Sequence, residues 1–269
     1  NILKNNGYSI FSIDNSRTGR EVTKDLTQPL PKKFFPKGIS HRNFWTNIEM
    51  LSIAKNLFTK NIPKKSFFMF WFDCRDDPNT SYCVEKTIEL FKEKNFFNDS
   101  IIVLTSDHGY PDPSTGFNKN SMRNLRHDMV VTDDNIKVPL FIKTPENLKG
   151  TVNEVVGHID LLPTILGMLN IELPSQNKIQ IKGLDIVKNR NKLSKNRIIR
   201  TDTRLLLQKG RITSLRNSNY KLVIYHDTDK KELYDLKNDP NELSPTSDFK
   251  NIDTSQFLEY FDKSNNDII

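Results

Sequence analysis

The feature that most constrains the fold is a short apolar run that ends abruptly in polar residues. Ile101–Thr105 is rich in β-branched side chains, which is typical of a buried strand in a parallel sheet. Parallel sheets bind ligands just beyond the carboxyl ends of their strands. There the chain continues as Ser106-Asp107-His108-Gly109. A carboxylate beside an imidazole is well placed to hold a divalent metal, and the alternative is that Asp107 caps a turn.

Strand and helix patterns alternate over most of the chain. The predicted strands are Tyr8–Ile13, Phe67–Asp73, Ile101–Asp107 and Val138–Lys143. The predicted helices are Arg42–Thr59, Ser81–Lys94 and Asp160–Leu169. This alternation predicts an α/β fold in which a mostly parallel sheet is sandwiched by helices.

The pattern changes after about residue 190. Arg211–Leu215, Tyr220–Tyr225 and Lys231–Leu236 predict short strands of a meander, and Thr254–Lys263 predicts a helix. We therefore expect residues 1–190 to form the α/β domain and residues 191–269 a small C-terminal subdomain with an antiparallel sheet. The polar segment Tyr110–Asn135 exceeds the length of a plain connection, which suits a substrate-binding loop.

Four motifs follow one another over about half of the chain. They are Thr105-Ser106-Asp107-His108-Gly109, Val138-Pro139-Leu140, Asp160-Leu161-Leu162-Pro163-Thr164 and the segment from Glu232-Leu233-Tyr234-Asp235-Leu236 to Glu242. In this order they resemble motifs of the sulfatase family, within the alkaline-phosphatase-like hydrolases. The resemblance implies an alkaline-phosphatase-like fold and metal-dependent cleavage of a sulfate ester, with residues 1–190 as the downstream part of the catalytic domain.

The resemblance also implies a nucleophile motif that this sequence does not show. Sulfatases carry a metal-binding pair of Asp residues and then Cys/Ser-x-Pro/Ala-x-Arg, whose Cys or Ser is oxidised to formylglycine. Cys74 and Cys83 lie outside such a motif, and Ser16–Arg20, expected to be an exposed turn, has Thr18 at the Pro/Ala position. Asn1–Tyr8 resembles the passage that follows the nucleophile. We therefore expect a fragment that lacks the N-terminal part with the nucleophile.

The same resemblance gives roles to three residues. Asp107 and His108 would bind the divalent metal of the family, which is commonly Ca²⁺, an ion that prefers oxygen ligands. The imidazole leaves Mn²⁺ and Zn²⁺ open. His127 stands where many sulfatases place a His that contacts the sulfate group or protonates the leaving oxygen. Its alternative is a surface position in a charged loop, and for His158 a packing role is expected.

Composition and charge limit the partners. The longest apolar run, Phe67–Phe72, is far shorter than the roughly 20 residues that span a bilayer, so no membrane span is expected. The net charge is +7, but the densest basic stretch, Lys182–Arg200, lacks interleaved aromatic residues. It therefore predicts a linker or exposed loop and no nucleic-acid interface. A positive field would attract a small anionic sulfate ester. Compartment and oligomeric state stay open.

Two other functions remain open at this point. A phosphodiesterase or phosphonate monoester hydrolase of the same superfamily uses nearly the same metal shell. The other alternative is a non-catalytic remnant that keeps the fold to bind sulfated glycans or a partner.

Overall fold

The computed structural model describes residues 2–14, 46–74, 78–111, 130–172, 182–205, 210–245 and 254–266. Contacts divide the chain into two compact units, residues 1–100 and 101–269. The expectations for Ser16–Arg20, for His127 and for most of the loop Tyr110–Asn135 fall outside the described residues. The domain boundary expected near residue 190 stays a prediction.

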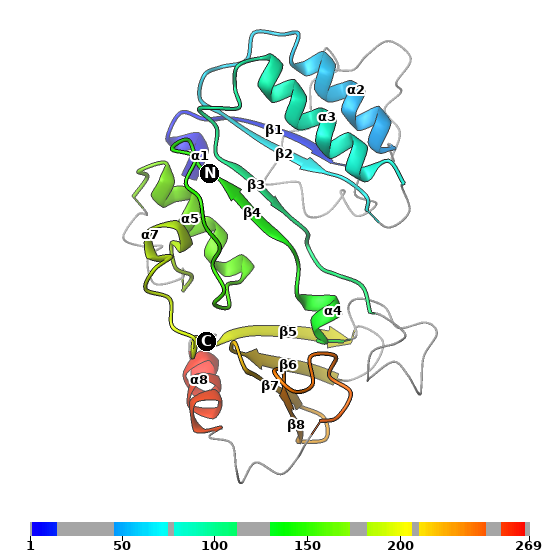
Figure 1. Ribbon diagram of the computed structural model, residues 1–269, viewed down its shortest axis with the longest axis vertical. Helices are drawn as coiled ribbons and strands as arrows, with labels where there is room; N and C mark the ends of the chain where they lie inside the picture. Colours follow the sequence, from blue (N-terminus) through cyan, green and yellow to red (C-terminus); the bar gives the residue numbers. More distant parts are fainter. Residues whose placement is uncertain are drawn as a thin grey trace. The chain divides into compact units, whose positions relative to one another are not determined.

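The first unit combines two parallel strands with two longer helices (Figure 1). Its elements are α1 (Ile2–Asn5), β1 (Ser9–Asp14), α2 (Asn47–Leu57), β2 (Ser66–Trp71) and α3 (Thr80–Glu93). β1 and β2 pair in parallel along their whole length, as the sequence predicted for neighbouring strands joined by a crossover.

Helix α2 begins at a capping box and buries one face. The backbone N–H of Thr46 donates to Glu49 Oε2 at 2.8 Å, and the backbone N–H of Glu49 donates to Thr46 Oγ1 at 3.2 Å. Two backbone N–H groups that have no partner within the helix thereby gain acceptors. The buried side of the helix packs with aromatic side chains from both strands and from α3. The core residues are Ile13, Met50, Ile53, Ala54, Leu57, Phe58 and Leu90, and the partly buried rings around them include Phe11, Phe68, Phe70 and Phe91.

Among the described residues of the second unit, the strand that ends at the Asp107-His108 turn pairs with an antiparallel neighbour, where a parallel one was expected. β3 (Ile102–Thr105) pairs with β4 (Leu140–Lys143), and within the described residues the two form an antiparallel sheet. An apolar run indicates an extended and partly buried strand, but it carries no information about the direction of its neighbour. The facing pair Leu104 and Phe141 is exposed at 41% and 65%.

A buried carboxylate organises the helices that follow β4. These elements are the 3₁₀ helix η3 (His158–Asp160), α5 (Leu161–Met168) and α7 (Ile186–Asn189). The Asp160 side chain is fully buried and accepts two hydrogen bonds from the Arg197 guanidinium, at 2.6 and 2.9 Å. It also accepts from the backbone N–H groups of Gly157 and Leu184, at 2.9 and 2.8 Å. This set of partners satisfies a carboxylate that would otherwise be costly to bury.

The C-terminal part is a four-stranded antiparallel sheet with one helix packed on it (Figure 1). Its elements are β5 (Ile199–Leu205), β6 (Gly210–Arg216), β7 (Tyr220–Tyr225), β8 (Lys230–Asp235) and α8 (Ser255–Asn266). The antiparallel subdomain and its helix are thereby confirmed. β5 was missed: the predicted linker Lys182–Arg200 covers only its first two residues, and the rest of the strand alternates charged and hydroxyl side chains.

β7, one of the two inner strands of this sheet, is buried on both faces. Leu222 and Ile224 pack in a cluster with Phe257 of α8, whereas Val223 packs with Val131 on the opposite face. Alternate residues of a strand point to opposite faces, so one strand contributes to both clusters.

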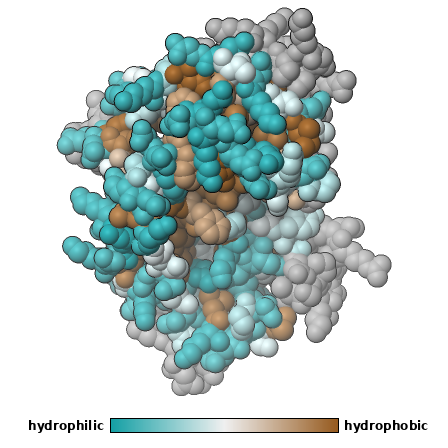
Figure 2. All heavy atoms as spheres, turned by 45° about the horizontal axis from the view of Figure 1, so that its top comes forward, coloured by the Kyte–Doolittle hydropathy of each residue, from teal (hydrophilic) through white to brown (hydrophobic). Residues whose placement is uncertain are grey.

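The surface is mainly hydrophilic, with apolar atoms in separate small areas, in the view of Figure 2. Among the described residues, none of the helices combines the length and the apolar character that a membrane crossing requires.

Candidate functional site

A tight turn after β3 brings the predicted ligands Asp107 and His108 together. Asp107 Oδ2 lies 3.3 Å from His108 Nε2. The other oxygen, Oδ1, accepts from the His108 backbone N–H at 2.9 Å, and Ser106 Oγ donates to the His108 carbonyl oxygen at 2.7 Å. Both side chains remain accessible, with 45% of Asp107 and 37% of His108 exposed. Asp107 Oδ2 and His108 Nε2 therefore face each other at the surface of the turn.

The hydrogen bond of His108 determines which ring nitrogen can bind a cation. His108 Nδ1 lies 2.6 Å from the Gly109 carbonyl oxygen, and since that oxygen only accepts, Nδ1 carries the proton. In the neutral ring, Nε2 then holds the lone pair. A lone pair 3.3 Å from a carboxylate oxygen is repulsive unless a proton or a metal ion lies between them. A backbone carbonyl that fixes the ring in this way is the usual outer partner of a metal-binding His, so the pair fits a divalent cation.

The turn is attached by its backbone to α4 (Asp133–Ile136). Gly109 N–H donates to the Asn135 carbonyl oxygen at 2.7 Å, and Tyr110 N–H donates to the Asp134 carbonyl oxygen at 3.1 Å. A Cβ at Gly109 would fall far inside contact distance of that Asp134 oxygen. Gly109 is needed because of this close approach of two backbones.

The turn opens onto a cleft of about 1210 Å³, which β3, β4, β5 and the segment before η3 line together. Basic described residues on its wall are Lys137, Lys143, Lys149, Arg190, Arg200 and Arg216, and acidic ones are Asp107, Glu154 and Asp202. Arg200 and Arg216 are paired with Asp202 and Asp133, so the lysines and Arg190 carry the excess positive charge, which favours an anionic ligand.

His158 also lies in this cleft. Its Nε2 is 3.5 Å from Thr105 Oγ1 at the end of β3, and its side chain is exposed. Sequence reasoning favoured a packing role for His158, and the structure instead places it at the cleft wall that holds Asp107 and His108. The sequence did not predict that His158 lies near His108, because the two residues are 50 positions apart in the chain.

The far wall of the cleft carries a charged cluster around Asp202. Burial disfavours its charge, but hydrogen bonds from Arg200, Thr213 and Arg211 outweigh that effect and hold the pKa of Asp202 below its usual value. Thr213 Oγ1 also lies 2.9 Å from His226 Nε2. Burial, followed by the nearby Arg211 charge, lowers the pKa of His226, so this imidazole is biased towards its neutral form. We assign these contacts to the stability of the sheet.

The predicted site is therefore brought together in part. Asp107 and His108 are adjacent on the cleft, whereas His127 lies outside the described residues. Among the residues that the structure describes, there is no group of three or more His, Cys, Asp or Glu side chains arranged for a metal. A calcium shell of roughly six to eight oxygens needs ligands beyond this pair.

Comparison with known proteins decides the family. The family "N-sulphoglucosamine sulphohydrolase, C-terminal" matches residues 126–260, half of the chain, and the family "Sulfatase" matches residues 78–171. The chain belongs to the sulfatase family. The recognition made from the four motifs is confirmed, since these two matches cover all of them.

One curated relative of this sulfatase chain is the uncharacterized sulfatase YidJ of Escherichia coli (strain K12), which is 29% identical over 178 residues. The match covers 60% of this chain and 32% of YidJ, so the chain corresponds to about a third of that relative.

Solved structures show the fold. The sulfatase chain superimposes on BT1596, described as a 2-O GAG sulfatase, with a TM-score of 0.69 at 14% identity, covering 100% of this chain and 73% of BT1596. The phosphonate monoester hydrolase SpPMH from Silicibacter pomeroyi gives a TM-score of 0.50 at 17% identity, covering 84% and 42%. The alkaline-phosphatase-like α/β class predicted from the sequence is thereby confirmed.

Proposed function

We propose that this chain carries the metal-binding turn and part of the substrate cleft of a metal-dependent sulfatase. The observation that supports this most is the pair Asp107 Oδ2 and His108 Nε2, 3.3 Å apart on a cleft whose charged wall is mainly basic. In a chain of the sulfatase family, this combination favours binding of a cation together with an anionic ester. The name of BT1596 suggests a sulfated sugar as the substrate class.

In this proposal Asp107 Oδ2 and His108 Nε2 hold the divalent cation, because the other ring nitrogen of His108, Nδ1, donates to the Gly109 oxygen. Ca²⁺ is the preferred ion, and the imidazole leaves Mn²⁺ and Zn²⁺ as alternatives. A bound cation would neutralise the negative oxygens of the sulfuryl group. A complete shell needs further ligands besides this pair.

The other residues of the cleft bind and orient the ester. Lys and Arg side chains on the wall attract the anion by their positive field, which is strongest at low ionic strength. For His127 we keep the role that the family resemblance implies, proton exchange with the leaving oxygen, a task that suits an imidazole near neutral pH.

The test uses the full-length protein. Metal analysis is expected to find a divalent ion, and an aryl sulfate is expected to turn over faster than an aryl phosphodiester. A faster phosphodiester reaction would favour the second candidate, a phosphodiesterase or phosphonate monoester hydrolase, which the shared fold with SpPMH supports. A protein without metal or turnover that still binds sulfated glycans would favour the non-catalytic alternative.

A further inference from the structure

A fully buried lysine links the C-terminal sheet to the region of the proposed metal site. Lys221 of β7 has no exposed side-chain surface. Its Nζ lies 2.6 Å from Asp133 Oδ1, contacts the Glu242 carboxylate and donates to the Val131 carbonyl oxygen at 2.9 Å. The buried ammonium is therefore held by two carboxylates and one backbone carbonyl oxygen. We call Lys221, Asp133 and Glu242 the anchor cluster.

Arg216 supports the cluster from the neighbouring strand. Its guanidinium donates to both oxygens of Asp133, with Nη2 to Oδ2 at 2.9 Å and Nε to Oδ1 at 3.1 Å. Burial disfavours the charge of Asp133, but Lys221 and Arg216 outweigh this and lower its pKa. Asp133 therefore remains a carboxylate although it is mostly buried.

Glu242 supplies the second carboxylate from an uncommon backbone conformation. Its φ is 55°, in the left-handed region that favours glycine, and its side chain is 3% exposed. Burial raises the pKa of Glu242, with Lys221 acting in the opposite direction. A strained, buried carboxylate persists only where the surroundings fix it, and such positions cluster at functional sites.

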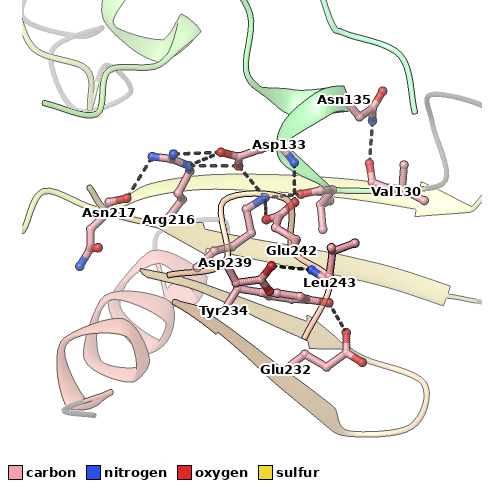
Figure 3. A network of polar contacts seen from close by, with 12 residues as sticks. Val130, Asp133, Asn135, Arg216, Asn217, Glu232, Tyr234, Asp239, Glu242 and Leu243 are labelled. Atoms are coloured by element: carbon pink, nitrogen blue, oxygen red, sulfur yellow. Dashed lines mark hydrogen bonds and ion pairs between the residues drawn. The ribbon is translucent and has the colours of Figure 1, made fainter. Parts of the chain in front are cut away.

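The carboxylate of Glu242 caps α4, the helix to which the proposed metal-binding turn is hydrogen-bonded. Thr132 precedes α4 without forming a side-chain cap, and Glu242 Oε2 accepts from the Asp133 backbone N–H at 2.7 Å instead (Figure 3). The next two residues of α4, Asp134 and Asn135, accept the hydrogen bonds of Tyr110 and Gly109 described above.

A continuous path of charged and backbone hydrogen bonds thus joins the C-terminal sheet to His108. Buried ion pairs contribute little net stability compared with apolar side chains, so stability alone does not account for the anchor cluster. The anchor cluster instead holds α4 in one position, and the Asp107-His108 turn is hydrogen-bonded to the backbone of α4.

We propose that the anchor cluster is a positioning device for the Asp107-His108 turn, and that Glu242 and Lys221 act through α4 to keep the two ligands in binding geometry. The part of this inference that concerns metal affinity rests on the proposed function. The part that concerns how Glu242 holds α4, and α4 the backbone of Gly109, is independent of the proposed function.

The test compares Glu242→Gln with Glu232→Gln in the full-length protein. Gln keeps the size of the side chain and an oxygen for Asp133, but removes the charge that faces Lys221. Glu232 is a matched control, because it is a buried carboxylate of the same sheet and bonds to Tyr225 and Tyr234 rather than to α4. Hydrogen exchange of the peptide 107–111 is followed by mass spectrometry. Ca²⁺ and Mn²⁺ binding are followed by calorimetry.

Exchange at Gly109 and Tyr110 is expected to rise about tenfold in Glu242→Gln and less than twofold in the control. The metal dissociation constant is expected to rise about tenfold in Glu242→Gln alone. If Glu242→Gln folds poorly, Glu242→Asp replaces it with the same expectations, because the shorter side chain keeps the charge but draws its oxygens away from the Asp133 backbone N–H. Equal exchange in Glu242→Gln and the control would overturn the proposal. Faster exchange with unchanged metal binding would retain the mechanical link and refute its role in metal binding.

Discussion

Replacing Gly109 by Ala tests whether the close approach of the turn and α4 is needed for metal binding. The φ of Gly109 is not in the left-handed region, so an Ala backbone is allowed there. Its Cβ, however, would overlap the Asp134 carbonyl oxygen, which is backbone and cannot rotate away. The turn must therefore move off α4, and the hydrogen bonds of Gly109 and Tyr110 are weakened or lost.

The magnitude follows from those two bonds. Each is worth about 0.5–1.5 kcal/mol, so the local loss is about 1–3 kcal/mol, similar to the cost of overpacking a filled site. A loss of about 2 kcal/mol corresponds to a rise of about 30-fold in the hydrogen-exchange rate of the peptide 107–111. The Ca²⁺ dissociation constant is expected to rise by about 10- to 100-fold, the range seen when the partners that orient metal ligands are disturbed.

Gly183→Ala is the matched control, because its Cβ would overlap the backbone carbonyl oxygen of Ile159 in the same way. It should destabilise the protein to a similar extent in a thermal melt, yet leave exchange at 107–111 and metal binding unchanged. The reasoning is refuted if Gly109→Ala binds Ca²⁺ like the wild type, or if Gly183→Ala weakens binding as much.

Three further predictions concern single side chains. Asp107→Ala should abolish both metal uptake and turnover in the full-length protein, and unchanged metal content would remove the site assignment. His127→Ala should lower turnover while metal content stays intact; an equal loss of metal would make His127 a ligand instead. Asp133→Asn should destabilise the protein by about 3 kcal/mol at neutral pH, because it leaves the charge of Lys221 poorly compensated. The pKa of Asp133 is lowered on folding, so its stabilisation is present above the ordinary value of 3.8 and lost as the pH falls through the folded pKa. The melting temperatures of wild type and Asp133→Asn should therefore converge below pH 3.8. A difference in melting temperature that does not change with pH would contradict a lowered pKa of Asp133.

The sequence predicted the fold well where apolar periodicity was strong. The strand before Asp107 and the helix α3 have the residue patterns that burial against a sheet requires. β5 was missed because its residues are polar and its pairing with β6 is set by the tertiary structure, which overrides strand propensity.

The candidate site was predictable only where its residues are neighbours in sequence. Asp107 and His108 were found together, but the approach of His158 to Thr105 depends on how the chain returns to β3. The sequence did contain an indication that Lys221 is buried among acceptors. This residue lies in an otherwise apolar strand that is buried on both faces, and a lysine there must find acceptors.

The hydrogen bonds between the turn and α4 also fix where the chain leaves and where it returns. Tyr110 N lies 3.1 Å from the Asp134 oxygen, so the points that flank residues 112–129 are fixed side by side. Closing a loop between such points costs only about 0.6 kcal/mol more for each doubling of its length. Changes in the length of the stretch that contains His127 therefore cost little free energy, and Asp107 and His108 can keep their positions while that stretch varies.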